Sequence, residues 1–85
     1  MNETLRLALA QYDFPVGALA ANAEKILSLT AAAKARGADL IVLPELALSG
    51  YPPEDLLLRP GFLADCERTL AAIAAQISGI TVVLP

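Results

Sequence analysis

The fold is decided by residues 40–56, which read LIVLPELALSGYPPEDL. Residues 40–43 are all apolar, a pattern typical of a strand that is buried on both faces of a sheet. Pro44 has no backbone N–H to donate to a sheet, so we expect the strand to end there. Glu45 therefore lies at the carboxyl end of a predicted strand, where open α/β sheets usually place their functional groups.

One strand and one helix are predicted before this stretch. Residues 4–10 alternate Leu5, Leu7 and Leu9 with other residues, which is the period of a strand. Residues 16–36 have the period of a helix, and Gly37 suits a left-handed cap at its end. The polar residues predicted to face water are Asn22, Lys25, Lys34 and Arg36. The predicted apolar stripe is Leu19, Ala23, Ile26, Leu27, Thr30 and Ala33.

Two helices and a strand are predicted after it. Pro53 suits the first position of a short helix, which we expect to end at residues 59–61. A longer helix follows over residues 62–78, with Gly79 as its cap, and residues 80–84 form another apolar strand. Helical connections favour parallel strands. The sequence therefore predicts an α/β fold that begins β-α-β-α-β.

The composition indicates that this fold is a segment of a larger domain. The 85 residues are 56% hydrophobic and 18% charged. A chain of this size buries only about 60% of the surface that it exposes when unfolded, so this composition is more apolar than a free-standing domain needs. We therefore expect apolar faces that are covered by chain beyond residue 85.

Charge and patterning exclude several classes of partner. The net charge is −3, and the six basic residues are scattered, so nucleic acid is not an expected partner. No apolar run approaches the ~20 residues that span a bilayer, so no membrane partner is expected. The N-terminus does not resemble a signal peptide, and a single cysteine fits a reducing compartment. The predicted location is the cytoplasm.

Few residues are candidates for chemistry. Histidine is absent, no metal-ligand spacing occurs, and no glycine-rich phosphate loop is present, so no metal or cofactor site is predicted here. We expect Cys66 to pack as a small hydrophobe, with a thiol pKa raised by its neighbours Asp65 and Glu67. Glu45 is a candidate general base, although a turn cap or an arginine pair would also explain it.

The same stretch resembles a known superfamily. Residues 37–51 (GADLIVLPELALSGY), with residues 7–11 (LALAQ) and Asn22, resemble the first catalytic motif and its surroundings in the nitrilase, or carbon-nitrogen hydrolase, superfamily. Residues 52–57 (PPEDLL) resemble the branch of glutamine-dependent NAD+ synthetases, in their glutaminase domain. The resemblance implies an α-β-β-α sandwich, of which residues 1–85 would be the N-terminal part of a glutamine amidotransferase domain.

The resemblance also implies roles for two residues. The superfamily uses a Glu-Lys-Cys triad, and Glu45 matches the glutamate that acts as general base. The lysine and the cysteine would belong to motifs beyond residue 85, and neither Cys66 nor the lysines present match them. Tyr51 matches a tyrosine near the glutamine site, which implies a substrate contact.

The implied activity belongs to a longer enzyme. It would hydrolyse glutamine and pass ammonia to a synthetase domain that converts deamido-NAD+ to NAD+ with ATP and Mg2+, and it would form homo-oligomers. The 85 residues alone would be inactive. Two alternatives are another amidase of the superfamily, such as an ω-amidase or a carbamoylase, and a non-enzymatic α/β interaction module in which Glu45 is only a turn residue.

Overall fold

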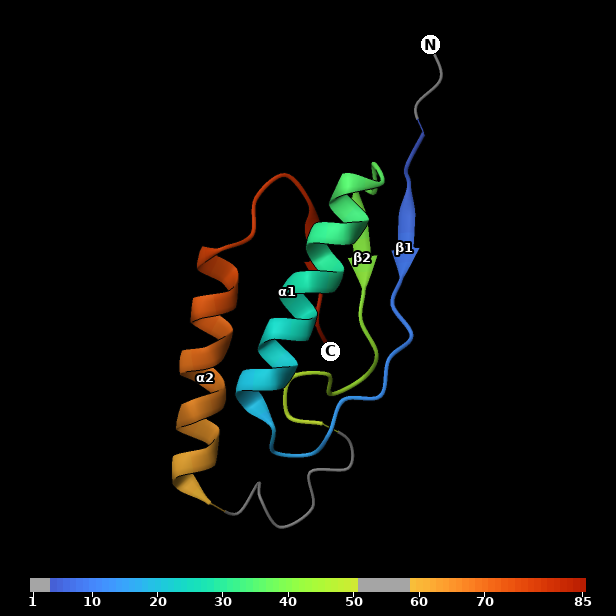
Figure 1. The fold of residues 1–85 in the computed structure, drawn as a ribbon. Helices are drawn as coiled ribbons and strands as arrows, with labels where there is room; N and C mark the ends of the chain where they lie inside the picture. The colour runs from blue at the N-terminus through green and yellow to red at the C-terminus, as the bar shows by residue number, and fades with distance from the viewer. Residues whose placement is uncertain (1–3, 51–58) are drawn as a thin grey trace.

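The computed structural model describes residues 4–50 and 59–85, which form a parallel sheet with two helices on one face (Figure 1). The elements follow the predicted order. They are β1 (Leu7–Leu9), α1 (Leu19–Ala35), β2 (Leu40–Val42), α2 (Pro60–Ala75) and β3 (Thr81–Val83). The short helix predicted at Pro53 lies outside the described residues.

The sheet has the strand order β1-β2-β3, so β2 lies in the middle. Both neighbours pair with it in parallel, and Ile41 lies opposite Ala8 on one side and Val82 on the other. The strands are shorter than the predicted runs. Backbone hydrogen bonds extend the pairing on both sides, since Asp39 N–H donates to the Arg6 carbonyl and Leu43 N–H to the Val83 carbonyl.

Helix α1 ends as its sequence predicts. Gly37 has φ +84°, which is the left-handed conformation that glycine adopts without strain. Gly37 N–H donates to the Lys34 carbonyl and Ala38 N–H to the Ala33 carbonyl, both at 3.0 Å. This pair of bonds is a Schellman motif. The helix begins three residues later than predicted because Gly17, at φ +76°, is not helical.

The prediction for the bounds of α2 was wrong at both ends. Pro60 is the first residue of α2, two residues before the predicted start, and its missing N–H is harmless at that position. The helix ends at Ala75, and Gln76 rather than Gly79 is its cap. Gly79 has φ +76° and lies in the turn before β3.

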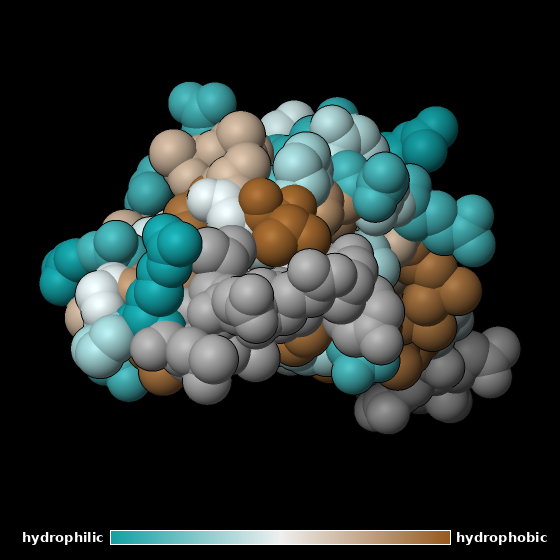
Figure 2. Space-filling model, turned by 90° about the horizontal axis from the view of Figure 1, so that it is seen from below, coloured by the Kyte–Doolittle hydropathy of each residue, from teal (hydrophilic) through white to brown (hydrophobic). Residues whose placement is uncertain are grey.

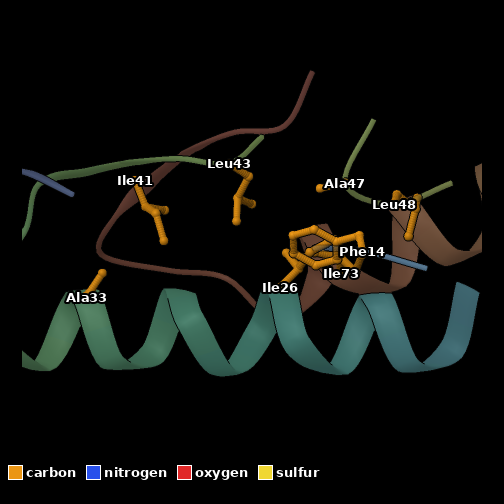
Figure 3. Packing of buried hydrophobic residues seen from close by; sticks show 8 residues of the cluster. All are labelled: Phe14, Ile26, Ala33, Ile41, Leu43, Ala47, Leu48 and Ile73. Atoms are coloured by element: carbon orange, nitrogen blue, oxygen red, sulfur yellow. The ribbon is translucent and has the colours of Figure 1, made fainter. Parts of the chain in front are cut away.

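The core lies between the helices and one face of the sheet. Figure 3 shows Ile41 and Leu43 pointing from the β2 segment towards Ile26 and Ala33 on α1. Phe14 and Ile73 belong to the same buried cluster, so the segment after β1 and helix α2 both contribute to it. The core therefore packs helices α1 and α2 and the segment after β1 against β2 and the residues that follow it.

The opposite face of the sheet is open in the described residues. Leu7 and Leu9 of β1 are 54% and 67% exposed, and Val83, which is in register with Leu9, is 41% exposed. This agrees with the expectation that these residues have an apolar face against which further chain packs. The predicted alternation in residues 4–10 is therefore real, but its leucine side points away from the helices.

Candidate active site

Glu45 lies in a turn of residues 45–49 that follows β2. In Figure 1 the arrows of β1 and β2 point towards this turn, so it lies at the carboxyl edge of the sheet. Figure 2 looks at that edge, where hydrophobic and hydrophilic atoms both reach the surface. The predicted position of Glu45 at the carboxyl end of a buried strand is confirmed.

The residue after Glu45 has an unusual backbone. Leu46 has φ +56°, which is the left-handed region that a branched side chain rarely enters. Its N–H donates to the Pro85 carbonyl at 3.2 Å, and its carbonyl accepts a 2.7 Å bond from Gly50 N–H. Strain of this kind is kept only where neighbours hold it, and it concentrates at functional sites. Leu46 thus fixes the direction in which the turn leaves β2.

The Glu45 side chain is exposed and lines a pocket of about 200 Å³. The remaining lining residues come from the same turn and from the segment after β1: Tyr12, Asp13, Phe14, Pro44 and Leu46. Within residues 4–50 and 59–85, its carboxylate has neither a backbone hydrogen bond nor an arginine partner. The turn-cap and ion-pair explanations of Glu45 therefore find no support in this part of the chain.

Two aromatic residues form one wall of this pocket. Phe14 is buried, and its ring meets that of Tyr12 edge to face at 5.0 Å between centroids. Lys25 Nζ lies 4.6 Å from the centre of the Tyr12 ring, so this lysine contacts an aromatic face and does not simply face water. Both aromatic residues lie in the segment after β1, where the chain leaves the sheet.

Asn22 is a second candidate: the sequence resemblance includes this residue but assigns it no role. Its predicted exposure was wrong: the side chain is only 1% exposed. Its amide nitrogen donates to the carbonyls of Pro15 and Leu48, at 2.8 and 2.9 Å. The signal was present in the spacing. The buried residues of α1 are Asn22, Ile26, Thr30 and Ala33.

Cys66 is half-buried on α2, as expected for a structural thiol. Burial raises the pKa of this thiol. The predicted direction is therefore correct, but the cause is burial and not the charge of Asp65, whose carboxylate pairs with Arg68. Cys66 lines a pocket with Leu70, Leu46 and other apolar residues behind the Glu45 turn. We therefore assign it to packing.

Three other expectations concern Tyr51, metal binding and membrane spans. Tyr51 lies outside the described residues. Within the described ranges, no three His, Cys, Asp or Glu side chains group so that they could hold a metal ion. Neither described helix has the length and hydropathy to cross a bilayer. The described site is thus one carboxylate at a sheet edge, with its supporting loops.

These features define the class of protein. A parallel sheet with helical connections and an exposed carboxylate after its central strand is an α/β arrangement suited to catalysis at the carboxyl edge. The chain belongs to the carbon-nitrogen hydrolase family, whose profile matches residues 6–83. Its fold is the opening β-α-β-α-β portion of the nitrilase-type sandwich, as predicted.

Individual relatives show which members of the family this chain is similar to. The glutamine-dependent NAD(+) synthetase of Xylella fastidiosa is 60% identical over 85 residues, which is 99% of this chain and 16% of the relative. The structure of glutamine-dependent NAD+ synthetase from Acinetobacter baumannii, in complex with ADP, matches with a TM-score of 0.87 and 38% identity over 94% of this chain and 15% of that one. An amidase from Nesterenkonia sp. matches with a TM-score of 0.77 and 28% identity, over 94% and 31%. The chain thus spans about a sixth of the length of its curated relatives.

Proposed function

We propose that residues 1–85 are the N-terminal part of a glutaminase domain that supplies ammonia for NAD+ synthesis. The observation that carries the proposal is the exposed Glu45 carboxylate at the carboxyl edge of the sheet, in a segment that is 60% identical to a glutamine-dependent NAD(+) synthetase. Cytoplasmic location, assembly into homo-oligomers and a contact of Tyr51 with glutamine belong to the same proposal.

Glu45 would act as a general base in a Glu-Lys-Cys triad. It would accept the proton of the cysteine thiol as the sulfur attacks the amide carbon of glutamine. It would then deliver that proton to the leaving ammonia, and a glutamyl thioester would remain. Water, deprotonated by the same carboxylate, would cleave the thioester to glutamate and the free thiol. The lysine would stabilise the negative oxygen of each tetrahedral intermediate.

The lysine, the cysteine and the synthetase reaction lie outside this segment. By the same resemblance, ATP, Mg2+ and deamido-NAD+ would bind a synthetase domain outside residues 1–85. The isolated segment would therefore have no glutaminase activity. What this chain supplies is a proton acceptor and the loops that hold it.

A second candidate is an amidase with another substrate. It is favoured by the match to the amidase from Nesterenkonia sp. at a TM-score of 0.77. The identity of that match is 28%, against 60% for the synthetase of X. fastidiosa, so we prefer the synthetase. The full-length protein separates the two, because only the synthetase makes NAD+ from deamido-NAD+ when either glutamine or ammonia is supplied.

The proposed role of Glu45 is tested by Glu45→Gln in the full-length protein. Loss of the proton acceptor should lower glutamine-driven NAD+ synthesis by about 10²- to 10⁴-fold, the usual contribution of a general base. Ammonia-driven synthesis should be unchanged, because ammonia bypasses the glutaminase site. The matched control is Glu67→Gln on the exposed side of α2, which should leave both activities intact.

Two results would contradict the proposal. Normal glutamine-driven turnover in Glu45→Gln would show that the carboxylate moves no proton, as the interaction-module alternative requires. Equal loss of both activities in a protein that remains folded would show that Glu45 does not act specifically in the glutamine reaction. Rates with glutamine and with ammonium chloride, measured on the same preparation, decide between these outcomes.

A further inference from the structure

Asn22 connects two loops that are distant in sequence. It lies near the start of α1, and its buried amide nitrogen donates one N–H to Pro15 and the other to Leu48. Pro15 belongs to the segment between β1 and α1, and Leu48 to the turn that carries Glu45. One side chain therefore links helix α1 and the segment before it to the turn that carries the candidate general base.

The contact between the two loops is close along its whole length. Gly17 N–H donates to the Ser49 carbonyl at 2.8 Å. Gly50 approaches so near that a Cβ added there would lie 2.4 Å from the Pro15 carbonyl oxygen. On the far side, the Leu46–Pro85 bond ties the turn to the chain leaving β3. The turn is thus hydrogen-bonded on both sides. Among the described residues, Asn22 is the only one whose side chain donates hydrogen bonds to both loops.

The chemistry of this bridge requires an amide. Two carbonyl oxygens face the Asn22 nitrogen, and its NH2 group offers them two donors from one uncharged atom on a short side chain. Aspartate has the same shape but would direct oxygen at both carbonyls. Serine has one donor on a shorter side chain, so it would satisfy one carbonyl at most.

We propose that Asn22 is a positioning residue for Glu45: its bridge between the Pro15 and Leu48 carbonyls holds the turn so that the carboxylate meets the reacting groups. The inference rests on the proposed function. It goes beyond packing, because it predicts loss of glutamine turnover in a protein that remains folded. A displacement of about 1 Å in a catalytic group can cost 10²-fold in rate.

The test uses Asn22→Asp in the full-length protein, assayed with glutamine and with ammonia. The kcat for glutamine-driven NAD+ synthesis should fall about 10- to 100-fold through misplacement of the base. The KM for glutamine and the ammonia-driven rate should stay close to their original values. The matched control is Thr30→Val: Thr30 is 4% exposed on the same stripe, but its hydroxyl donates only within α1, to the Ile26 carbonyl at 2.7 Å. It should change neither rate.

A double substitution shows whether Asn22 acts through Glu45. If it does, Asn22→Asp should cause no further loss of glutamine turnover in the Glu45→Gln background, because residues that act as a unit are not additive. A residue with a merely structural role would lower both backgrounds by the same factor. If Asn22→Asp does not yield folded protein, Asn22→Ser takes its place: it brings no negative charge to the carbonyls and cannot bridge both of them, so the same loss is expected.

Several outcomes would overturn the inference alone: normal glutamine turnover in the Asn22 variants, equal loss of the glutamine and ammonia activities, or full additivity with Glu45→Gln. A different result identifies failure of the underlying function. If Glu45→Gln itself turns over glutamine normally, the proposed general base is wrong, and the positioning role of Asn22 is wrong with it.

Discussion

Gly50 shows at the scale of one residue how tightly the candidate site is held. Its φ of +80° lies in the region that favours glycine, and its missing side chain lets the Glu45 turn touch the segment after β1. A Cβ there would meet backbone atoms of Pro15 and Val16 at 2.4–2.6 Å, and backbone cannot rotate out of the way as a side chain can. The two loops can meet only because residue 50 is glycine.

Gly50→Ala should therefore lower the free energy of unfolding by at least about 2 kcal/mol, since the left-handed backbone alone costs an L-residue about 1–2 kcal/mol. The matched control is Gly61→Ala in the first turn of α2, where an added Cβ meets nothing within 4 Å. It should be neutral or stabilising by up to about 1 kcal/mol, because alanine suits a helix better than glycine does. Urea unfolding of the two variants measures both values. Equal stability would contradict the close approach.

Glu45 and Asn22 differ in how far the sequence alone could reveal them. Glu45 could be found because the information is local: an apolar run, a proline that ends it and a carboxylate are adjacent. Asn22 could not be found by treating polar side chains as solvent-facing, since its partners are carbonyls 7 and 26 residues away. Hydrogen bonds to distant backbone carbonyls offset the cost of burying the amide, and only the tertiary fold shows where those carbonyls lie.

At the scale of elements, the strands and helices were predictable because their periods are local. The ends of α2 were not, because Pro60 can follow one helix or begin the next, and its sequence neighbours allow both. Gly37 and Gly79 look alike before their strands, yet only Gly37 takes part in a helix cap. The difference depends on where each helix stops packing, which is a property of the core.

The packed side of α2 sets the reactivity of Cys66. Burial raises the pKa of its thiol, so the fraction present as the nucleophilic thiolate at pH 7 is smaller in the folded than in the unfolded protein. We expect iodoacetamide to label Cys66 more slowly in native protein than in urea, with a rate that rises with pH towards the raised pKa. Mass spectrometry of the peptide containing Cys66 measures this. Rapid native labelling at pH 7 would contradict a structural thiol.

At the scale of the whole molecule, the sheet is covered unequally. Helices α1 and α2 pack on the face that carries Ile41 and Leu43, whereas Leu7, Leu9 and Val83 on the other face remain exposed in the described residues. A row of exposed leucines on a sheet is unusual for a free-standing protein, because such patches are normally interaction surfaces. The sandwich expected from the family would place a second sheet over these residues, and this agrees with the apolar composition.

Leu9→Lys tests whether this face is covered in the full-length protein. In the 85-residue chain Leu9 is 67% exposed, so lysine should reduce self-association, measured by light scattering, by removing part of the apolar patch. In the full-length protein the same lysine would be buried without a partner, and the free energy of unfolding should fall by about 3 kcal/mol or more. Leu63→Lys on α2 is the control: Leu63 is also exposed, at 46%, but it lies on a helix and not on the sheet. Unchanged stability of Leu9→Lys in the full-length protein would mean that this face of the sheet stays in water. It would contradict the expectation that a second sheet covers the exposed leucines.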